Sequence, residues 1–515
     1  MTVPKSADFA AAISEGYAAD GPAIELGRGV HDGKLHADAA VRIPLAMMNR
    51  HGLIAGATGT GKTRTLQLLA EALSTAGVPV FAADVKGDLS GLAVAGEAGG
   101  AAEKRMGELG LPFAPTGFPV EYLALGGVGA GVPVRATVSE FGPQLLGKVL
   151  GANRTQEQSL ALVFHYADEK GLPLVDLADL RALLTYLDSD AGKPELKGIG
   201  GLSGATVGVL LRSLVELEEG GGTELFGEPQ FAIADLLRAA PDGRGVISCL
   251  ELPGVQDKPK LFSTALMWLL AELFEDLPEV GDLEQPKLVF FFDEAHLLFD
   301  GATEAFLDSV AQTVRLIRSK GVGVFFITQN PQDLPGEVLG QLGSRVQHAL
   351  RAFTPEDAKA LRATVSTYPR SDFYDLEELL TGLAIGEAVV TVLSDRGVPT
   401  PVVHTRLVAP AARMAPANDV EAVAKASPLY ARYGERLDAR TAREILAERL
   451  AAPAPLPPTE AEPPREPAPT RRRRRTPAPA PAGPPDFGDF LRSRQGQQLQ
   501  RKVLRGVFGM LRKRL

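Results

Sequence analysis

Short apolar runs alternate with segments of helical periodicity along most of the chain. The runs predict buried strands at residues 51–55, 80–83, 245–250, 287–292 and 322–328, and two further runs, 345–349 and 387–393, extend the same pattern. After the first run, Leu66, Leu69 and Leu73 recur at the spacing of one helix face, and Gly77 and Pro79 then stop that helix. Strands that alternate with helices favour a largely parallel sheet with helices on both faces. We therefore expect an α/β fold with a mainly parallel central sheet.

The middle and the two ends of the chain follow other patterns. Helical periodicity in residues 156–170, 174–187 and 206–218 lies between glycine-rich turns and predicts a mostly helical insertion. The N-terminal segment carries turn signals at Asp20-Gly21-Pro22 and His31-Asp32-Gly33. The expected organisation is an N-terminal segment (1–47), a core (48–98 and 241–415), a mostly helical insertion (99–240), a helical extension (416–450), a linker (451–485) and a basic amphipathic helix (486–515).

The C-terminal part differs from the rest in proline content and in charge. Residues 451–485 hold thirteen of the 39 prolines, so they are expected to form an extended, mobile spacer. Residues 471–515 hold thirteen Lys and Arg against two acids, a net charge of +11, so the remainder carries −20 of the total of −9. The tail is expected to contact nucleic acid, lipid or another subunit, although the run 471–475 also fits a solvated charge run. Docking of the last helix on protein is the interpretation we favour.

Cysteine content and hydropathy limit the class of protein. The single cysteine, Cys249, excludes a disulfide within the chain and a cysteine-based zinc finger. The longest apolar stretch, residues 264–274, is short for a membrane span and contains Glu272. The N-terminus lacks the pattern of a signal peptide. We therefore expect a soluble, cytoplasmic protein.

A glycine-rich motif directly follows the first predicted strand. Residues 56–63 read Gly-Ala-Thr-Gly-Thr-Gly-Lys-Thr, which fits the phosphate-loop pattern, and the flanking strand and helix fit as well. Glycines let the backbone N–H groups turn into one concavity, and the helix N-terminus adds partial positive charge. Lys62 would reach the β- and γ-phosphates, and the Thr63 hydroxyl would ligate Mg²⁺. The expected nucleotide-binding residues are Gly56, Ala57, Thr58, Gly59, Thr60, Gly61, Lys62, Thr63 and Arg64.

Two adjacent acids end another apolar run. Residues 288–292 are followed by Asp293 and Glu294, and a buried strand has little reason to end in two carboxylates unless a cation lies there. Asp293 suits a role in Mg²⁺ binding, and Glu294 suits polarising the water that attacks the γ-phosphate. The alternative is a helix N-cap without catalytic role. His296 completes the string and is expected to hold the local turn or to relay the nucleotide state.

Three further groups of residues are weaker candidates. Thr328 or Gln329, at the end of the run 322–328, would sense the γ-phosphate, or would simply cap the strand. Arg345 and Arg351 are candidates for an arginine that reaches the γ-phosphate of a neighbouring subunit, although arginine is also a common surface residue. The segment 84–88, Asp-Val-Lys-Gly-Asp, ends the second strand and would hold the site together or bind a substrate.

Taken in this order, GATGTGKT, FAADVKGD, FFFDEAH and FFITQ resemble the HerA/FtsK group of RecA-like motor ATPases. More narrowly, the chain resembles the bacterial helicase HerA-like proteins of the YjgR type. Residues 49–67, 344–361 and 505–509 support this, and the resemblance covers most of residues 20–410. The N-terminal segment is too short to match the β-barrel of archaeal HerA, and nothing matches the winged helix of FtsK.

The resemblance implies a RecA-like P-loop NTPase core and a homo-oligomeric ring, a hexamer, with nucleotide sites between subunits. It implies hydrolysis of ATP with Mg²⁺, coupled to movement of a polymer that is usually DNA. When the roles of the family's residues are transferred to the matching positions, Lys62 and Thr63 bind nucleotide and Mg²⁺, and Asp293 and Glu294 are the acidic pair. Gln329 becomes the sensor, and Arg345 or Arg351 becomes the finger.

Four functions remain open from the residues. The first is a ring-forming, ATP-driven DNA translocase or helicase, whose hydrolysis DNA would stimulate. The second is an ATPase or nucleotide switch that acts on a protein or another polymer, indifferent to DNA. The third, a small-molecule kinase, is disfavoured by the chain length and by Glu294. The fourth, a structural or membrane-surface protein with a degenerate site, is disfavoured because Lys62, Thr63, Asp293 and Glu294 are intact.

Overall fold

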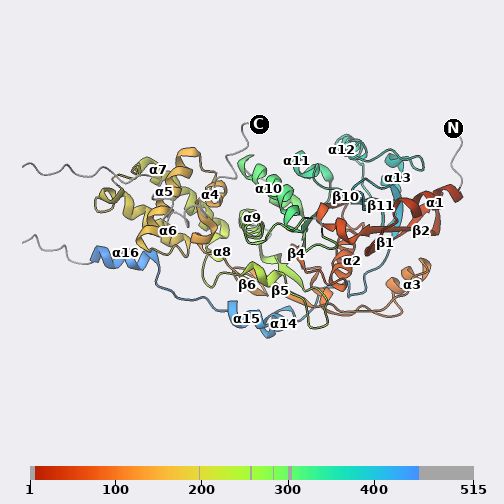
Figure 1. Ribbon diagram of the computed structural model, residues 1–515, viewed down its shortest axis with the longest axis horizontal. Helices are drawn as coiled ribbons and strands as arrows, with labels where there is room; N and C mark the ends of the chain where they lie inside the picture. The colour runs from red at the N-terminus through yellow and green to blue at the C-terminus, as the bar shows by residue number, and fades with distance from the viewer. Residues whose placement is uncertain (1–5, 197, 256–257, 282, 300–303, 452–515) are drawn as a thin grey trace, which may run out of the picture. The chain divides into compact units, whose positions relative to one another are not determined.

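The computed structural model describes residues 6–451, apart from 197, 256–257, 282 and 300–303. The chain divides into two units, residues 1–443 and 444–515, and the sheet and the site lie in the first (Figure 1). Apart from Ala451, the expected linker 451–485 and the expected basic helix 486–515 lie outside the described residues.

A twelve-stranded sheet organises the first unit. Its strands are β1 (Ala23–His31), β2 (Lys34–Pro44), β3 (Gly52–Ala55), β4 (Val80–Asp84), β5 (Val120–Leu125), β6 (Val132–Val134), β7 (Ile247–Glu251), β8 (Leu288–Phe292), β9 (Val322–Thr328), β10 (Ser344–Gln347), β11 (Glu387–Thr391) and β12 (Val403–Leu407). Their order across the sheet is β2-β1-β12-β11-β10-β3-β9-β8-β4-β7-β5-β6.

Most of this sheet is parallel. From β10 to β6 every pair of neighbouring strands is parallel. At the other side, β11, β12, β1 and β2 pair antiparallel. The parallel strands are buried along nearly their whole length, as their continuous apolar sequence predicts. The expected α/β fold with a mainly parallel sheet is confirmed.

Five strands have no counterpart among the predicted ones. The N-terminal segment forms the hairpin β1–β2, which turns at Asp32 and Gly33, and joins the sheet through β12. Within residues 99–240, β5 and β6 extend the parallel part. These strands are short or mix charged residues and glycine with apolar ones, so their local pattern is weak. They become strands because each has a partner in the sheet.

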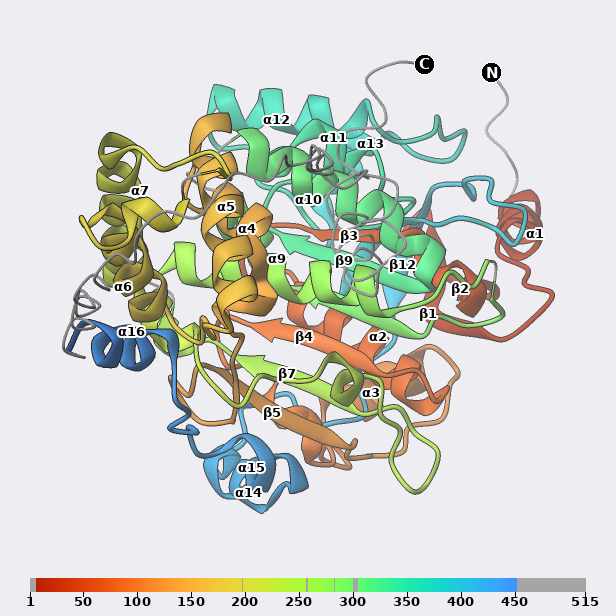
Figure 2. The same ribbon diagram turned by 60° about the vertical axis from the view of Figure 1, so that its left-hand side comes forward.

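Helices cover both faces of the sheet. The helices are α1 (Ser6–Gly16), α2 (Lys62–Thr75), α3 (Ala101–Glu108), α4 (Val138–Val149), α5 (Arg154–Lys170), α6 (Leu177–Asp188), α7 (Gly204–Leu217), α8 (Thr223–Leu225), α9 (Pro259–Asp276), α10 (Glu304–Ile317), α11 (Gly336–Leu339), α12 (Pro355–Val365), α13 (Leu376–Gly382), α14 (Val420–Ala426), α15 (Pro428–Tyr433) and α16 (Ala442–Ala451). Figure 2 shows α9 and α10 in front of the sheet and α2 behind it.

The apolar face of α2 anchors the helix against the sheet. Leu66, Leu69 and Leu73 are fully buried and belong to one core cluster with Ile54 of β3 and Phe291 of β8. This packing holds the first turn of α2 directly beyond the carboxyl end of β3. Burial of a leucine side chain contributes roughly 1.5–3 kcal/mol, so the position of this helix is strongly determined.

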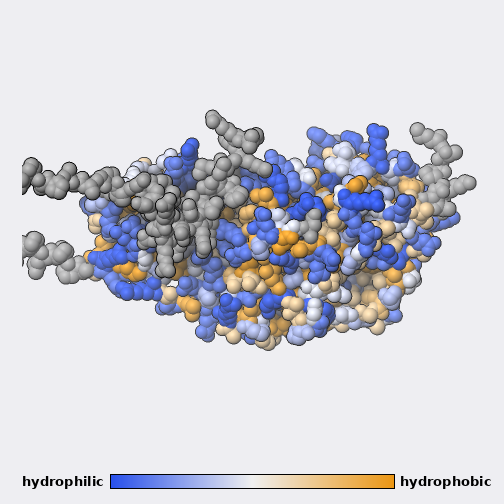
Figure 3. Space-filling model, in the orientation of Figure 1, coloured by the Kyte–Doolittle hydropathy of each residue, from blue (hydrophilic) through white to orange (hydrophobic). Residues whose placement is uncertain are grey.

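The surface of the molecule is largely hydrophilic on the face seen in Figure 3, where apolar residues form small groups. Across the described part of the chain, none of the helices is both long and apolar enough to cross a lipid bilayer.

Candidate active site

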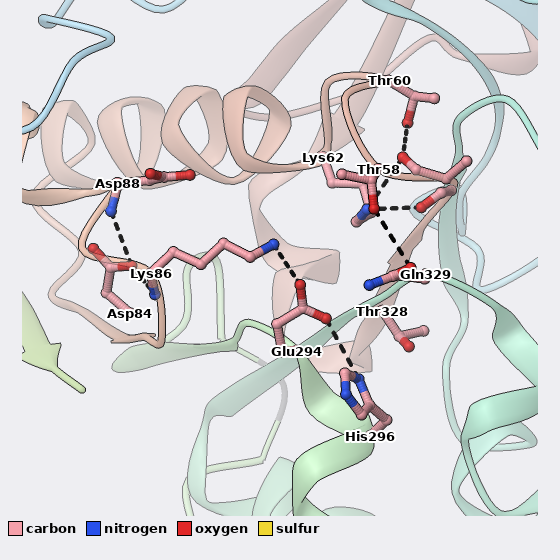
Figure 4. A network of polar contacts seen from close by, with 12 residues as sticks. Thr58, Thr60, Lys62, Asp84, Lys86, Asp88, Glu294, His296, Thr328 and Gln329 are labelled. Atoms are coloured by element: carbon pink, nitrogen blue, oxygen red, sulfur yellow. Dashed lines mark hydrogen bonds and ion pairs between the residues drawn. The ribbon is translucent and has the colours of Figure 1, made fainter. Parts of the chain in front are cut away.

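Four neighbouring strands bring the predicted site residues to one edge of the sheet. The strands lie in the order β3-β9-β8-β4 and are all parallel. Their carboxyl ends lead into the phosphate loop, Gln329, the acidic pair and Asp84, respectively. Ligands of open parallel sheets bind beyond the carboxyl ends of the strands. Segments more than 200 residues apart in sequence therefore meet at one edge, as Figure 4 shows.

The phosphate loop has the backbone that its glycines predict. Gly59 and Gly61 have φ angles of 78° and 120°, a region that residues with a Cβ rarely adopt. Helix α2 begins directly after Gly61 without a side-chain capping hydrogen bond. Its first N–H groups are thus left for another acceptor, which suits a phosphate.

Lys62 is buried within the loop. Its Nζ donates hydrogen bonds to the carbonyl oxygens of Gly56 at 2.7 Å and Ala57 at 3.3 Å. Burial lowers the pKa of Lys62, while the charges of Glu294 and Asp293 act to raise it. The structure thus brings the lysine and the acidic pair to the same edge of the sheet, within electrostatic reach of one another (Figure 4).

Neighbouring strands hold the phosphate loop from behind. The N–H of Gly56 donates to the carbonyl of Thr328, and that of Ala57 donates to the carbonyl of Ala349. His348 lies fully buried below the loop, with Nε2 2.8 Å from the Thr65 hydroxyl. A Cβ at Gly56 would approach the Cβ of His348 to 2.5 Å, so only glycine fits there. His348 was not among the residues predicted from the sequence, although a histidine inside the run 345–349 is a recognisable signal.

The acidic pair lies at the end of β8 and is nearly inaccessible to solvent. Asp293 is 3% exposed, and burial together with the charge of Glu294 raises its pKa to about 7. Glu294 has φ 46° and ψ 49°, the left-handed region, which is uncommon for a residue other than glycine. Such backbone conformations concentrate at functional sites. The side chains of the two acids thus leave the strand at a sharp turn.

Lys86 makes an ion pair with Glu294 that the sequence analysis did not foresee. Its Nζ lies 2.5 Å from Oε1 of Glu294, and Figure 4 shows the side chain of Lys86 extended toward that carboxylate. The other carboxylate oxygen, Oε2, lies 3.4 Å from Nδ1 of His296. Burial raises the pKa of Glu294, but the hydrogen bond and charge of Lys86 outweigh it, so the pKa stays below its ordinary value.

The segment around Lys86 is held by Asp84. One carboxylate oxygen of Asp84 accepts from the backbone N–H groups of Lys86, Gly87 and Asp88, and the other accepts from Leu89 at 2.6 Å. Asp84 is fully buried, and burial raises its pKa to about 6. The motif at 84–88 therefore forms a fixed turn that presents one lysine to the site. Of the two roles left open for it, holding the site together has direct structural support.

Glu251 is a further buried acid, which was not among the residues predicted from the sequence. It ends β7 directly opposite Asp84 in the parallel register. Burial and the charge of Asp84 raise its pKa to about 8. Like Asp84, it is the last residue of a buried strand, and this pattern in residues 247–251 could have been recognised in the sequence.

Thr328 and Gln329 occupy the end of β9 between the phosphate loop and the acidic pair. The hydroxyl of Thr328 donates to Asp333 at 2.7 Å, so it caps the local turn. Gln329 lies beside the phosphate loop, with Oε1 3.5 Å from the Thr58 hydroxyl. Gln329 also lines a hollow of about 550 Å³, together with His296, Phe299, Asn330 and Asp333.

The two arginine candidates differ in their surroundings. Arg345 lies within β10, where its guanidinium donates to Thr367 and packs over the ring of Tyr368. Arg351 is exposed and follows Ala349, whose carbonyl holds the phosphate loop. Arg64, on the first turn of α2, donates to Gln67 at 2.6 Å. Their proposed roles stay predictions.

The residues present fit a nucleoside triphosphate and a magnesium ion. The uncapped first turn of α2 and the loop glycines suit phosphate oxygens. Among the described residues, no group of three or more His, Cys, Asp or Glu side chains could hold a metal by itself. Magnesium commonly takes one or two protein ligands plus substrate phosphates and water, so Thr63 and Asp293 would suffice.

A family model described as "Helicase HerA-like C-terminal" matches residues 31–514. No curated protein matches the sequence.

Solved structures of similar fold include a plasmid coupling protein and a VirB4 protein. The coupling protein TrwB, in complex with a non-hydrolysable ATP analogue, has 17% identity and a TM-score of 0.50, covering 77% of this chain and 98% of that one. VirB4 of Thermoanaerobacter pseudethanolicus has 17% identity and a TM-score of 0.48, covering 75% of this chain and 96% of that one. TrwB in complex with ADP and Mg²⁺ has 15% identity and a TM-score of 0.49, covering 78% and 99%.

Proposed function

Because the chain belongs to the helicase HerA-like C-terminal family and is a P-loop ATPase, we propose that it couples Mg²⁺-dependent ATP hydrolysis to the movement of DNA. One observation carries this proposal. Lys62 of the phosphate loop and the acids at 293 and 294 come from distant segments, yet they lie within electrostatic reach at one edge of the sheet. A triphosphate on the loop would meet a carboxylate suited to activate water.

Each residue has a task in this chemistry. Backbone N–H groups of residues 59–63 and Lys62 bind the phosphates and neutralise charge as it develops. Glu294 takes a proton from the attacking water, and Gln329, beside the loop, orients the γ-phosphate end of the substrate. Thr63 and Asp293 would hold magnesium, which when bound would supply charge neutralisation on the phosphate oxygens. Positioning and electrostatics together account for catalysis of this type.

A ring of six identical subunits is the assembly we propose. Arg351 is the better candidate for an arginine that reaches a neighbouring site, because it is exposed and follows the segment that contacts the phosphate loop. Arg345 is engaged by Thr367 and Tyr368 within its own chain. An arginine in this role stabilises charge in the transition state and is worth roughly 10³–10⁵ in rate.

A second candidate function is hydrolysis coupled to a protein or another polymer. The net charge of −20 on residues 1–470 favours it, because an acidic surface repels a phosphate backbone. If the protein acts on DNA, local basic regions and the tail of residues 471–515 make the contact with it. A cytoplasmic location belongs to the proposal in either case.

One experiment separates these two functions. The rate of ATP hydrolysis is measured with and without single- and double-stranded DNA, on protein whose oligomer size is known from light scattering. Stimulation by DNA that declines with added salt supports a DNA motor. Hydrolysis that DNA leaves unchanged at every salt concentration supports the second candidate.

A further inference from the structure

We propose that Lys86 is a positioning residue that latches Glu294 away from the attacking water, so that the ATPase stays slow until the latch opens. This inference rests on the proposed function. It concerns a residue for which the sequence motifs assigned no specific role. The contacts on both sides of the ion pair carry the argument.

The first step concerns the carboxylate. Oε1 of Glu294 lies 2.5 Å from Nζ of Lys86, and Oε2 faces Nδ1 of His296 at 3.4 Å. Figure 4 shows the carboxylate turned toward these two side chains, while Lys62 bonds within the phosphate loop. A general base must hold a lone pair toward the water within hydrogen-bond reach. Oε1 is held by Lys86, and Oε2 has no hydrogen-bond partner, so the ion pair fixes the direction in which Oε2 faces and weakens the carboxylate as a base.

The second step concerns the support of the lysine. Four backbone N–H groups, of residues 86–89, donate to the carboxylate of Asp84. Gly87, at φ 79°, allows the turn, and the Ser90 hydroxyl donates to its carbonyl at 3.0 Å. The backbone of Lys86 is therefore fixed relative to β4. The turn therefore directs the side chain of Lys86 toward the end of β8, the neighbouring strand.

The third step concerns how the latch opens. The side chain of Lys86 is 41% exposed, whereas that of Glu294 is 7% exposed. The lysine can therefore swing into solvent on its flexible stem without unpacking the core. A nucleotide phosphate near Lys62 offers Lys86 a competing anion, which lowers the free-energy difference between the paired and released states. Binding of substrate thus weakens the ion pair without abolishing it, so part of the substrate-bound protein still holds Glu294 latched and turnover stays slow.

The test compares ATP turnover in Lys86→Met, Lys86→Arg and the wild type, without DNA. Lys86→Met keeps the length of the side chain but removes the charge, so kcat should rise about fivefold while KM changes by less than about twofold. Lys86→Arg, which restores the cation, should return kcat toward the wild-type value. A change in kcat alone separates a latch from a structural role, which would also weaken substrate binding.

A second readout does not depend on turnover. Acetic anhydride labels lysines at rates set by exposure and pairing, and mass spectrometry reports the rate at Lys86. Glu294→Gln removes the partner charge, so Lys86 should be labelled faster in this variant than in the wild type, both without nucleotide. Lys425, paired with Glu421 on the exposed face of α14, serves as the control and should be labelled equally in both.

Three outcomes decide the matter. A kcat of Lys86→Met at or below the wild-type value overturns the latch, because it makes the lysine neutral or helpful to catalysis. Equal labelling of Lys86 in wild type and Glu294→Gln also overturns it. Failure of the proposed function has a different signature: wild type, Lys86→Met and Lys425→Met would all bind and hydrolyse no ATP, and this would remove the inference together with its premise.

Discussion

Lys62 is an unusual lysine, because it is 7% exposed and bonds to carbonyl groups rather than to a carboxylate. Two carbonyl oxygens only partly compensate a buried ammonium group, as its lowered pKa indicates. An anion on the loop would supply the missing charge. Lys62 is thus preorganised to bind phosphate before the nucleotide binds.

Removing this charge should weaken nucleotide binding. For Lys62→Ala we expect affinity for a non-hydrolysable ATP analogue to fall by about 10–100-fold, the value of a charge-assisted hydrogen bond. Isothermal titration calorimetry measures it, with Lys425→Met as the matched loss of a lysine elsewhere. An affinity equal to that of the control would contradict the role of the loop.

Replacing Glu294 should reduce hydrolysis without changing nucleotide binding. For Glu294→Gln we expect turnover to fall by about 10²–10⁴-fold, the usual contribution of a general base, while affinity for ATP stays within about threefold. Single-turnover measurements with radiolabelled ATP would show the substrate trapped uncleaved. Normal turnover in this variant would show that another group activates the water.

At this scale the sequence predicted residue types well and pairings poorly. Asp293 and Glu294 were recognisable because charged residues rarely end a buried strand without a purpose. The pairing of Lys86 with Glu294 was not, because it depends on β4 lying beside β8 and on the turn that Asp84 holds. Neither the strand order nor that turn can be deduced from the spacing of residues along the local sequence.

At the scale of elements, a buried acid joins α2 to a distant segment. Glu71 is 5% exposed and accepts from the N–H groups of Ala411 and Ala412. Burial raises its pKa to about 7, although these hydrogen bonds act to lower it. The helix that carries the phosphate loop is therefore tied to residues 411–412 through a group that titrates near neutral pH.

This linkage gives stability a definite dependence on pH. The folded pKa of Glu71 is above the ordinary value of 4.5, so the folded chain holds an extra proton between these values. The contribution of Glu71 to the free energy of unfolding is therefore fully present below about pH 4.5 and is lost as pH rises through about 7. From pH 5 to pH 8 the wild type should lose on the order of 2 kcal/mol relative to Glu71→Gln.

Urea unfolding followed by circular dichroism at both pH values measures this difference. Glutamine keeps one acceptor oxygen but loses the second, which adds an offset that does not vary with pH. A gap between the two proteins that is the same at pH 5 and pH 8 would count against the shift in pKa.

Elements with a strong local pattern were predictable, and elements that depend on partners were not. The runs at 288–292 and 322–328 became β8 and β9, because continuous apolar sequence is suited to a strand buried on both faces. β1 holds Glu25, Arg28 and two glycines, and β6 has only three residues. These segments form strands because neighbouring strands pair with them. Tertiary context overrides propensity at such positions.

At the scale of the molecule, charge is divided between an acidic body and a basic tail. Residues 471–515 carry +11 and the remainder −20. The tail lies outside the described residues, and its role stays a prediction. Its charge nevertheless makes it the first part of the chain to test for contact with an anionic polymer.

Deleting residues 471–515 should weaken binding to DNA or reduce the oligomer size, and leave ATP turnover without DNA within about twofold, because the site lies elsewhere. Fluorescence anisotropy with duplex DNA at two salt concentrations and light scattering measure the two effects. If both affinity and oligomer size match those of the full chain, the tail has no part in either.

The antiparallel side of the sheet has a consequence for biosynthesis. β1 is paired on one side by β2 and on the other by β12, which begins at Val403. At about 5–20 residues per second, a ribosome needs roughly 20–70 s to make the intervening chain. During that time the N-terminal hairpin has a bare edge, and the nascent chain must keep it from pairing with other chains until β12 emerges to cover it.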